Sequence, residues 1–245
     1  MELSKEFEQK FRSAKSVCVL TGAGVSAESG VPTFRGGGDT TAVWKGMPFD
    51  QISSARMVSE NLAEVWEWFD YRRGVLSKCT PNPAHETLAK WEQDFSEFTL
   101  VTQNVDGLHA RAGSKNVIEV HGNINRSRCL GCGVRFDMDV GSVPHTPVKC
   151  NECSGNLRPD VVLFGEMLPA GVFEEAVEKA AVCELFFVIG TSALVYPAAS
   201  LPEIAKRNGA YVVEVNPEKT PLSELCDESF RGRAGEILQE INRVF

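Results

Sequence analysis

Four of the eight cysteines in this 245-residue chain are spaced like the ligands of one metal ion. Cys129 and Cys132 form one C-x₂-C pair, Cys150 and Cys153 form a second, and 17 residues separate the pairs. This double spacing, which ordinary core thiols would not require, is typical of a tetrahedral zinc site with four thiolate ligands. Because four protein ligands close the coordination sphere, the predicted zinc is structural and leaves no open position for water.

A glycine-rich turn is the second group with chemical meaning. Residues 22–27 read G-A-G-V-S-A, follow the apolar run 16–20, and fit the pattern G-x-G-x-x-A. Small residues there let backbone amides approach the pyrophosphate of a dinucleotide, although a plain strand-to-helix turn fits the same pattern. The acidic residue expected about 20 positions later to bind the adenosine ribose is absent. Asn216, at the end of a later strand, is a candidate for that role.

The third candidate is His121, which directly follows the apolar segment 117–120. The end of a parallel strand is the edge at which open α/β sheets bind ligands, and imidazole is suited to general-base chemistry near neutral pH. A lone histidine is nevertheless more often structural than catalytic. The same structural reading is kept for His85, His109 and His145.

Short apolar segments alternate with helical ones along most of the chain. This alternation predicts a doubly wound parallel sheet of the Rossmann type, with glycine turns at the strand ends. The predicted strands are residues 16–20, 98–102, 117–120, 185–189 and 211–215, and the predicted helices are residues 84–94, 172–181, 198–207 and 234–243. Gly30 and Pro32 would break a helix, so we expect a loop over the ligand after the glycine turn.

Two regions interrupt the alternation. Residues 36–80 are loop-like and then helical through 61–76, and residues 126–158 are rich in Cys, Gly and Pro with little periodicity. We predict that both form a smaller zinc-binding and helical module. The NAD-binding, Rossmann-type domain would then comprise residues 1–35, 81–125 and 159–245.

Composition sets the remaining limits. A hydrophobic content of 43% is typical of a globular protein, and no apolar run approaches the roughly 18 residues that span a bilayer. The first residues lack a secretory signal and suggest an amphipathic helix, so we expect a cytoplasmic protein with reduced thiols. A net charge of −8 argues against direct nucleic-acid binding, although Arg126, Arg128 and Arg135 lie near the cysteines. The oligomeric state stays open, with a monomer as one option.

Taken together, the ordered motifs resemble those of the sirtuins, which are NAD-dependent protein lysine deacylases. The resemblance spans nearly the whole chain and is closest to short prokaryotic members. The matching segments are G-A-G-V-S (22–26), S-G-V-P-T-F-R (29–35), T-Q-N-V-D-G-L-H (102–109), H-G (121–122), the two cysteine pairs, V-V-L-F-G-E (161–166), G-T-S (190–192) and E-V-N (214–216).

The resemblance implies a role for individual residues. The zinc would be structural, the acyl-lysine would lie between Val161 and Phe164, and its peptide would pair with the nearby extended segment. NAD would be bound by Gly22, Ala23, Gly24, Ala27, Phe34, Arg35, Gln103, Asn104, Val105, Asp106, Gly190, Thr191, Ser192, Asn216 and Ala234.

The resemblance also implies a mechanism. The acyl oxygen of the substrate would attack the nicotinamide-ribose carbon, and nicotinamide would leave. His121 would act as the general base that activates a ribose hydroxyl, while Asn104 and Asp106 would order the carboxamide and a water. Phe34 would shield the reactive carbon from early hydrolysis. The products would be free lysine, nicotinamide and O-acyl-ADP-ribose.

The acyl group is suggested by the helix at residues 66–73, W-E-W-F-D-Y-R-R. It resembles a helix of the sirtuin branch that removes succinyl and malonyl groups, in which a tyrosine and an arginine three residues later bind the acyl carboxylate. Arg72 matches the arginine, but Phe69 stands in place of the tyrosine. We therefore expect acetyl groups to be removed and acidic acyl groups to be accepted with a weaker preference, unless Arg72 lies on a solvated face.

Two other functions remain open at this point. A protein ADP-ribosyltransferase or an NAD glycohydrolase would use the same NAD site. A non-enzymatic NAD- and zinc-binding module would have no need of His121.

Overall fold

A six-stranded parallel sheet forms the centre of the larger part of the molecule. The computed structural model describes residues 3–32, 43–138 and 148–244. In the sheet, the strand order is β11-β10-β9-β1-β4-β5, so the chain winds outward from β1 in both directions. The doubly wound fold is therefore confirmed. The strands are β1 (Ser16–Thr21), β4 (Glu97–Thr102), β5 (Val117–Glu119), β9 (Leu185–Ile189), β10 (Tyr211–Val215) and β11 (Glu228–Phe230).

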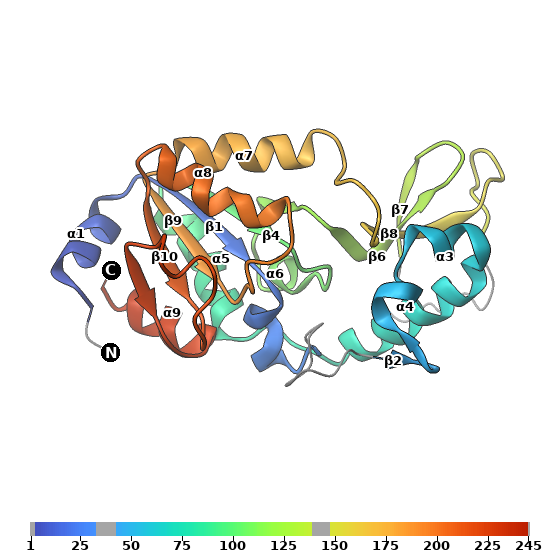
Figure 1. Cartoon of the computed structure of the whole chain (residues 1–245), viewed down its shortest axis with the longest axis horizontal. Coiled ribbons are helices and arrows are strands. Elements are labelled where there is room, and N and C mark those ends of the chain that lie inside the picture. The colour runs from blue at the N-terminus through green and yellow to red at the C-terminus, as the bar shows by residue number, and fades with distance from the viewer. Residues whose placement is uncertain (1–2, 33–42, 139–147, 245) are drawn as a thin grey trace.

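Helices cover both faces of this sheet (Figure 1). Val17 and Val19 of β1 pack in the core with α1 (Lys5–Ser13), α5 (Pro83–Asp94) and α9 (Ala234–Asn242). Cys18 and Leu20 of the same strand point to the opposite core, with α7 (Val172–Val182) and α8 (Leu201–Arg207). Successive side chains of a strand face opposite ways, so a strand buried on both faces must be apolar throughout. This requirement is what made the central strands predictable.

A smaller antiparallel sheet lies beside the large one. It contains β7 (Arg135–Asp137), β6 (Gly122–Cys129) and β8 (Leu157–Val161) in that order. The sequence showed little periodicity in residues 126–158 and predicted no strands there, yet the region contains most of this sheet. Strand β6 carries polar residues, and its pairing with β8 is irregular between Gly122 and Ser127, which hides the alternation expected of a strand.

The helical region packs against this small sheet at the right of Figure 1. Helix α4 (Leu62–Leu76) confirms the helix predicted over 61–76, and its Trp66 donates a hydrogen bond to the carbonyl of Leu157 at 2.9 Å. None of the described helices is long and apolar enough to cross a membrane. The remaining elements are η1 (Ala23–Ser29), β2 (Val43–Trp44), β3 (Met47–Pro48), α2 (Phe49–Ile52), α3 (Ala55–Glu60), α6 (Leu108–Arg111) and η2 (Ala198–Ser200).

Candidate functional site

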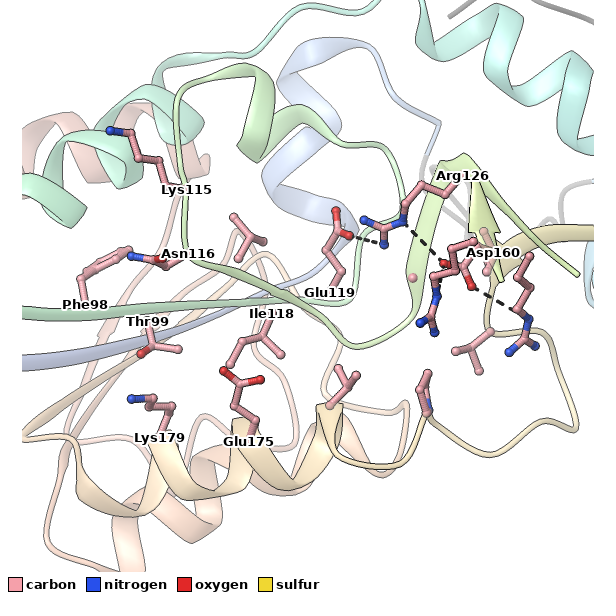
Figure 2. A pocket seen from close by; sticks show the side chains of 18 residues that line it. Phe98, Thr99, Lys115, Asn116, Ile118, Glu119, Arg126, Asp160, Glu175 and Lys179 are labelled. Atoms are coloured by element: carbon pink, nitrogen blue, oxygen red, sulfur yellow. Dashed lines mark hydrogen bonds and ion pairs between the residues drawn. The ribbon is translucent and has the colours of Figure 1, made fainter. Parts of the chain in front are cut away.

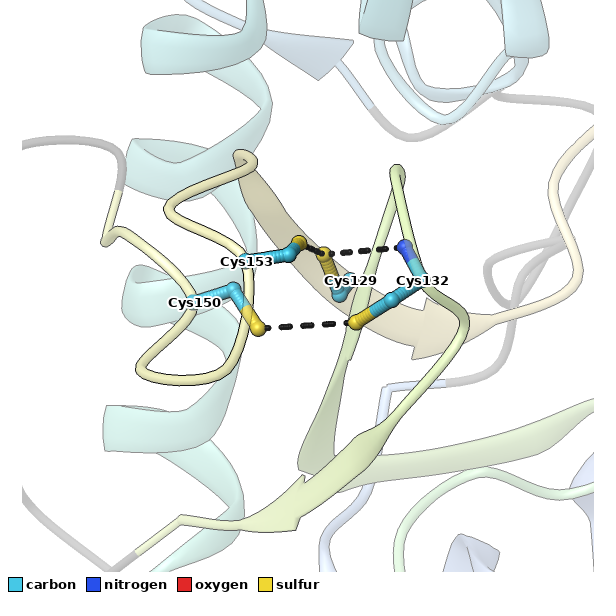
Figure 3. Close-up of side chains that lie close together, drawn as sticks. All are labelled: Cys129, Cys132, Cys150 and Cys153. Carbon is cyan, nitrogen blue, oxygen red and sulfur yellow. Dashed lines mark hydrogen bonds between the residues drawn. The ribbon is translucent and has the colours of Figure 1, made fainter.

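The four predicted metal ligands converge at the end of the small sheet (Figure 3). Sγ of Cys129 lies 3.4 Å from that of Cys153, and Sγ of Cys132 lies 3.7 Å from that of Cys150. All four sulfur atoms lie within 4.8 Å of one another. Zn–S bonds of about 2.3 Å in a tetrahedron place sulfurs about 3.8 Å apart, so the cluster fits zinc.

Backbone amides prepare this cluster for a metal. The amides of Cys132 and Gly131 donate to Sγ of Cys129, and the amide of Glu152 donates to Sγ of Cys150. The amide of Cys132 is the main cause that lowers the pKa of Cys129 to about 6. Hydrogen bonds to sulfur stabilise the thiolate, which is the form that binds zinc.

The glycine turn after β1 lies tightly against the end of β9. The amide of Gly24 donates to the carbonyl of Gly190 at 2.7 Å, and a Cβ on Gly24 would lie 2.7 Å from the Gly190 backbone. Only glycine permits this approach. Asn216 at the end of β10 donates to the carbonyl of Thr191 at 2.8 Å. The ends of β1, β9 and β10 therefore form one backbone-lined edge, which is where such sheets bind ligands.

His121 lies at the end of β5 and faces the neighbouring strand end. Its Nδ1 is 2.9 Å from the carbonyl oxygen of Gln103. Because a carbonyl oxygen only accepts, Nδ1 carries the proton in the neutral ring and Nε2 is left with a lone pair. Burial lowers the pKa of His121 below its ordinary 6.5, and the bond to Gln103 offsets part of this effect. A neutral ring with a basic Nε2 is thus favoured near pH 7.

Gly122 fixes the backbone direction directly after His121. Its φ is 78°, and a Cβ there would lie 2.1 Å from the carbonyl oxygen of Asp160. No other residue fits without moving β8. The H-G dipeptide is therefore a geometric requirement of the junction between the two sheets.

Asn104 and Asp106 are buried between the glycine turn and α6. Both contact Ser26, whose hydroxyl accepts from Asn104 Nδ2 at 3.1 Å and donates to Asp106 Oδ2 at 2.8 Å. Burial raises the pKa of Asp106, while the bonds from the Leu108 amide and Ser26 and the charge of Arg72 oppose the rise. Hydrogen bonds to the carboxylate stabilise its charged form. Ser26 thus fixes the orientation of both side chains.

The residues predicted to surround the acyl group lie on α4, β8 and the segment after β8. Phe69 is 3% exposed and belongs to the same apolar cluster as Val161. Phe164 is 50% exposed and stands edge-on to Phe49, with ring centroids 5.4 Å apart. The guanidinium of Arg72 lies 5.6 Å from the ring centroid of Trp68, and burial lowers its pKa while the charge of Asp106 raises it. Arg72 therefore packs over Trp68 of its own helix and lies close enough to Asp106 for their charges to interact.

The motifs that form this site match a known protein family. A sequence model of the Sir2 family matches residues 22–197, which include the glycine turn, His121 and the four cysteines. The chain belongs to the Sir2 family. The resemblance to sirtuins is thereby confirmed.

Curated members of the Sir2 family align over nearly the whole chain. The NAD-dependent protein deacylase of Aquifex aeolicus is 46% identical over 226 residues, which cover 92% of this chain and 93% of that protein. NAD-dependent protein deacylase 1 of Caldanaerobacter subterraneus is 47% identical over 233 residues and covers 95% of each chain.

Solved Sir2 structures have the same fold. A Sir2 homologue in complex with NAD superposes with a TM-score of 0.91 at 40% identity, covering 99% of this chain and 94% of that one. A Sir2 protein with a p53 peptide and NAD⁺ gives a TM-score of 0.85 at 31% identity, covering 99% and 98%.

The described residues include only part of the Sir2 site that was predicted from sequence. Phe34 and Arg35 lie outside the described residues. Ala27 is exposed on η1, whereas Ala234 is buried at the start of α9, where the neighbouring amide of Gly235 donates to Glu28. The residues that the structure brings together are Gly22, Gly24, Gln103, Asn104, Asp106, His121, Gly190, Thr191 and Asn216.

Ser26 and His85 contact residues of this candidate site, although the sequence analysis gave Ser26 no role beyond the glycine turn and read His85 as structural. His85 Nδ1 accepts from the amide of Asn82, so its Nε2 carries the proton and faces the Ser26 hydroxyl at 3.3 Å. His109 packs against His85 with ring centroids 4.8 Å apart, and burial lowers the pKa of His85 to about 4 and that of His109 to about 3. For His85 the only local signal was its position, with Asn82 and Pro83, at a helix start.

Proposed function

We propose that this protein removes acyl groups from protein lysines with NAD as the co-substrate. Its membership of the Sir2 family and its relatives named NAD-dependent protein deacylase support this function. Related structures described as complexes with NAD, ADP-ribose and acetylated peptide support it further. The observation that carries the proposal is the orientation of His121, whose Nε2 is free to take a proton at the ligand-binding edge.

Each residue would contribute through its position. NAD supplies the ribose carbon that accepts the acyl oxygen when nicotinamide leaves. The turn at Gly22 and Gly24 and the edge at Gly190 and Asn216 would hold the phosphates and adenosine. Asn104 and Asp106 would order the nicotinamide side, and His121 Nε2 would accept the proton of the reacting ribose hydroxyl.

The substrate end and the metal complete the proposal. Val161 and Phe164 would flank the acyl-lysine, and an extended peptide would pair with the exposed backbone beside them. Zinc at the four cysteines would stabilise the small sheet. We assign NAD binding to residues 1–35, 81–125 and 159–245, with 36–80 and 126–158 as the smaller module. We also propose a cytoplasmic protein that acts without direct binding to nucleic acid; four of its cysteines would be zinc-bound thiolates rather than members of disulfides.

One experiment separates this function from its rivals. A panel of acyl-lysine peptides is incubated with NAD, and the products are identified by mass spectrometry. Deacylated peptide together with O-acyl-ADP-ribose supports the proposal. ADP-ribose attached to protein indicates a transferase, ADP-ribose alone indicates a glycohydrolase, and unchanged NAD indicates a binding module.

The acyl preference is the finer part of the proposal. We propose that Arg72 binds the carboxylate of succinyl- or malonyl-lysine, because its guanidinium is partly buried and lies near Asp106. Bidentate Arg–carboxylate contacts are strong, although Asp106 already offsets part of the charge of Arg72. Phe69 supplies no hydroxyl, so the preference over acetyl is expected to be weak.

Replacing Arg72 by methionine is expected to lower kcat/KM for succinyl-lysine by roughly 10–100-fold, which corresponds to one or two lost hydrogen bonds to a charged group. Turnover of acetyl-lysine should stay nearly unchanged, since no carboxylate is involved. Phe69→Tyr is expected to raise succinyl-lysine turnover relative to acetyl-lysine. Paired kcat/KM measurements on both peptides check this. If the wild-type protein does not turn over succinyl-lysine, or if Arg72→Met turns it over equally well, Arg72 does not bind an acyl carboxylate. The protein would then be a plain deacetylase.

A further inference from the structure

A groove with a volume of about 660 Å³ runs along the free edge of the large sheet (Figure 2). None of the described residues assigned to NAD lines it. One wall is the consecutive segment 115–119, which includes β5, the last strand in the sheet order. The facing wall is α7, which contributes Val172, Glu175 and Lys179 at helical spacing. At its far end the groove reaches Asp160 and the arginines of the small sheet.

Positive charge exceeds negative charge in this groove. Five cationic side chains and three acidic ones line it, although the whole chain has a net charge of −8. The cationic residues are Lys115, Arg126, Arg128, Arg135 and Lys179, and the acidic ones are Glu119, Asp160 and Glu175.

Asp160 lies among more cationic than acidic side chains. Its carboxylate is 8% exposed and lies 2.9 Å from Nε of Arg135, 3.5 Å from Nε of Arg126 and 3.9 Å from Nε of Arg128. One carboxylate therefore faces three guanidinium groups, of which Arg126 also pairs with Glu119 at 2.6 Å and Arg128 with Glu166 at 3.5 Å. Arg135 has no second carboxylate partner among the described residues.

The opposite end of the groove carries two more cations. Lys115 and Lys179 are exposed, and among the described residues neither forms an ion pair. Figure 2 shows both at the end of the groove away from Arg126 and Asp160. Strand β5 itself is three residues long, or about 10 Å, and the amides of Lys115 and Asn116 before it donate to the carboxylate of Glu92. The cations therefore lie beyond the two ends of this short strand edge.

We propose that this groove binds an acidic segment of a partner polypeptide in extended conformation, added as a strand to β5. The outer edge of β5 has no strand partner among the described residues, so its backbone groups are available for pairing. Acidic side chains on such a strand would meet Lys115 and Lys179 at one end and Arg135 at the other. Charge complementarity of this kind favours one class of partner and speeds its association.

A polypeptide fits the groove better than a nucleic acid does. Glu119, Asp160 and Glu175 lie among the cations and would repel a continuous phosphate backbone. Phe98 is the only aromatic side chain on the wall, so bases would find little surface to stack on. A peptide can place its carboxylates at intervals between these acidic groups.

The acidic segment would belong to the substrate protein. This part of the inference rests on the proposed deacylase function. Gly122 and Val161 line the groove, and they directly adjoin His121 and the segment that carries Phe164. The groove would then select acyl-lysines that have acidic sequence nearby.

Binding is measured without any acyl group, so that the groove is tested apart from the activity. A fluorescein-labelled octapeptide of alternating Glu and Thr is titrated with the protein by fluorescence anisotropy. A matched peptide has Gln for each Glu, and another has N-methylated alternate amides that cannot pair with β5. We expect the Glu peptide to bind at least about tenfold more tightly than either control, with affinity that falls as salt rises.

The variant Lys115→Gln/Arg135→Gln/Lys179→Gln should weaken binding of the Glu peptide about tenfold or more. All three side chains are exposed, Arg135 at 54%, so circular dichroism should show an intact fold. Arg56→Gln/Arg207→Gln/Arg243→Gln removes the same three charges at side chains that are 80%, 74% and 73% exposed and outside the groove, so it is the control for net charge. An equal loss in this control, equal binding of the Gln peptide, or tighter binding of a single-stranded oligonucleotide would overturn the proposal.

The catalytic arm uses acyl-lysine peptides that end in the same Glu or Gln tail. The Glu tail should raise kcat/KM in the wild-type protein, and the advantage should vanish in the triple variant. If the Glu peptide binds specifically but the Glu tail does not change kcat/KM, the groove binds acidic segments but does not select substrates. Absence of deacylation from every peptide would count against the proposed function while the anisotropy result still decides the groove.

Discussion

Replacing His121 by alanine is expected to lower kcat for deacylation by about 10²–10⁴-fold, the usual contribution of a general base. The ring lies at the end of β5 with Nδ1 bound to the Gln103 carbonyl, so the substitution removes Nε2 from the edge at which NAD would bind. The glycine turn and the end of β9 are held by separate backbone bonds, so the fold and NAD binding should persist. Peptide turnover by mass spectrometry and NAD binding by calorimetry check both expectations.

His121→Asn is the matched variant for this test. Its amide nitrogen can still donate to the Gln103 carbonyl, but the side chain has no group that accepts a proton near pH 7. A loss as large as that of His121→Ala assigns the effect to the base. Recovery of most of the activity in His121→Asn would instead give His121 a positioning role only.

The pH dependence of activity is a second test of His121 as the general base. Burial lowers the pKa of His121 below 6.5, so the neutral ring predominates at pH 6.5 and gives way to the protonated ring at lower pH. Activity should therefore fall as pH drops, with a midpoint below pH 6.5. A decline of kcat/KM that is centred above pH 6.5 would contradict this assignment.

Loss of zinc is expected to abolish activity through the loss of structure. Cys132→Ala removes one of four sulfur atoms that lie within 4.8 Å of one another. Structural zinc contributes about 10–16 kcal/mol in isolated zinc-binding peptides, so even a fraction of this would unfold the small sheet. The variant should contain less than one zinc per chain by elemental analysis and should melt at a lower temperature.

Cys226→Ala is the control for this substitution, because Cys226 is a free thiol distant in sequence from the cluster. It should retain one zinc and near-normal activity. Chelation of the wild-type protein should reproduce the effect of Cys132→Ala. A folded, active protein without zinc would exclude a structural metal.

The features that could be predicted from sequence depend on neighbours along the chain. Val17 to Leu20 reveal a buried strand because both faces of the large sheet are covered, and the cysteine spacing reveals the metal site because each pair lies in one tight turn. Strand β6 was missed because Ser127 is buried while Arg126 is ion-paired with Glu119, which obscures the pattern of alternate apolar residues.

The rest depends on contacts that spacing does not encode. Ser26 lies in the glycine turn that the sequence revealed, but it meets His85 and Asp106 across 59 and 80 positions, so no local pattern could show these contacts. The groove along β5 needs α7, β6 and β8 to be placed first. Likewise, α4 predicts that Phe69 and Arg72 share a side of the helix, but only its packing against the core shows that Phe69 is buried while Arg72 approaches Asp106.

Because His85 and His109 are buried, the stability of the region around the glycine turn depends on pH. Both pKa values are depressed in the folded chain, to about 4 and about 3, whereas an unfolded histidine titrates near 6.5. Below pH 6.5 the unfolded chain therefore takes up protons that the folded chain excludes. The stabilising effect of keeping both rings neutral is complete above pH 6.5 and is lost progressively as pH falls toward 4. Acid should thus loosen the packing beneath Ser26 and Asp106 first, and a bound dinucleotide should delay that loosening.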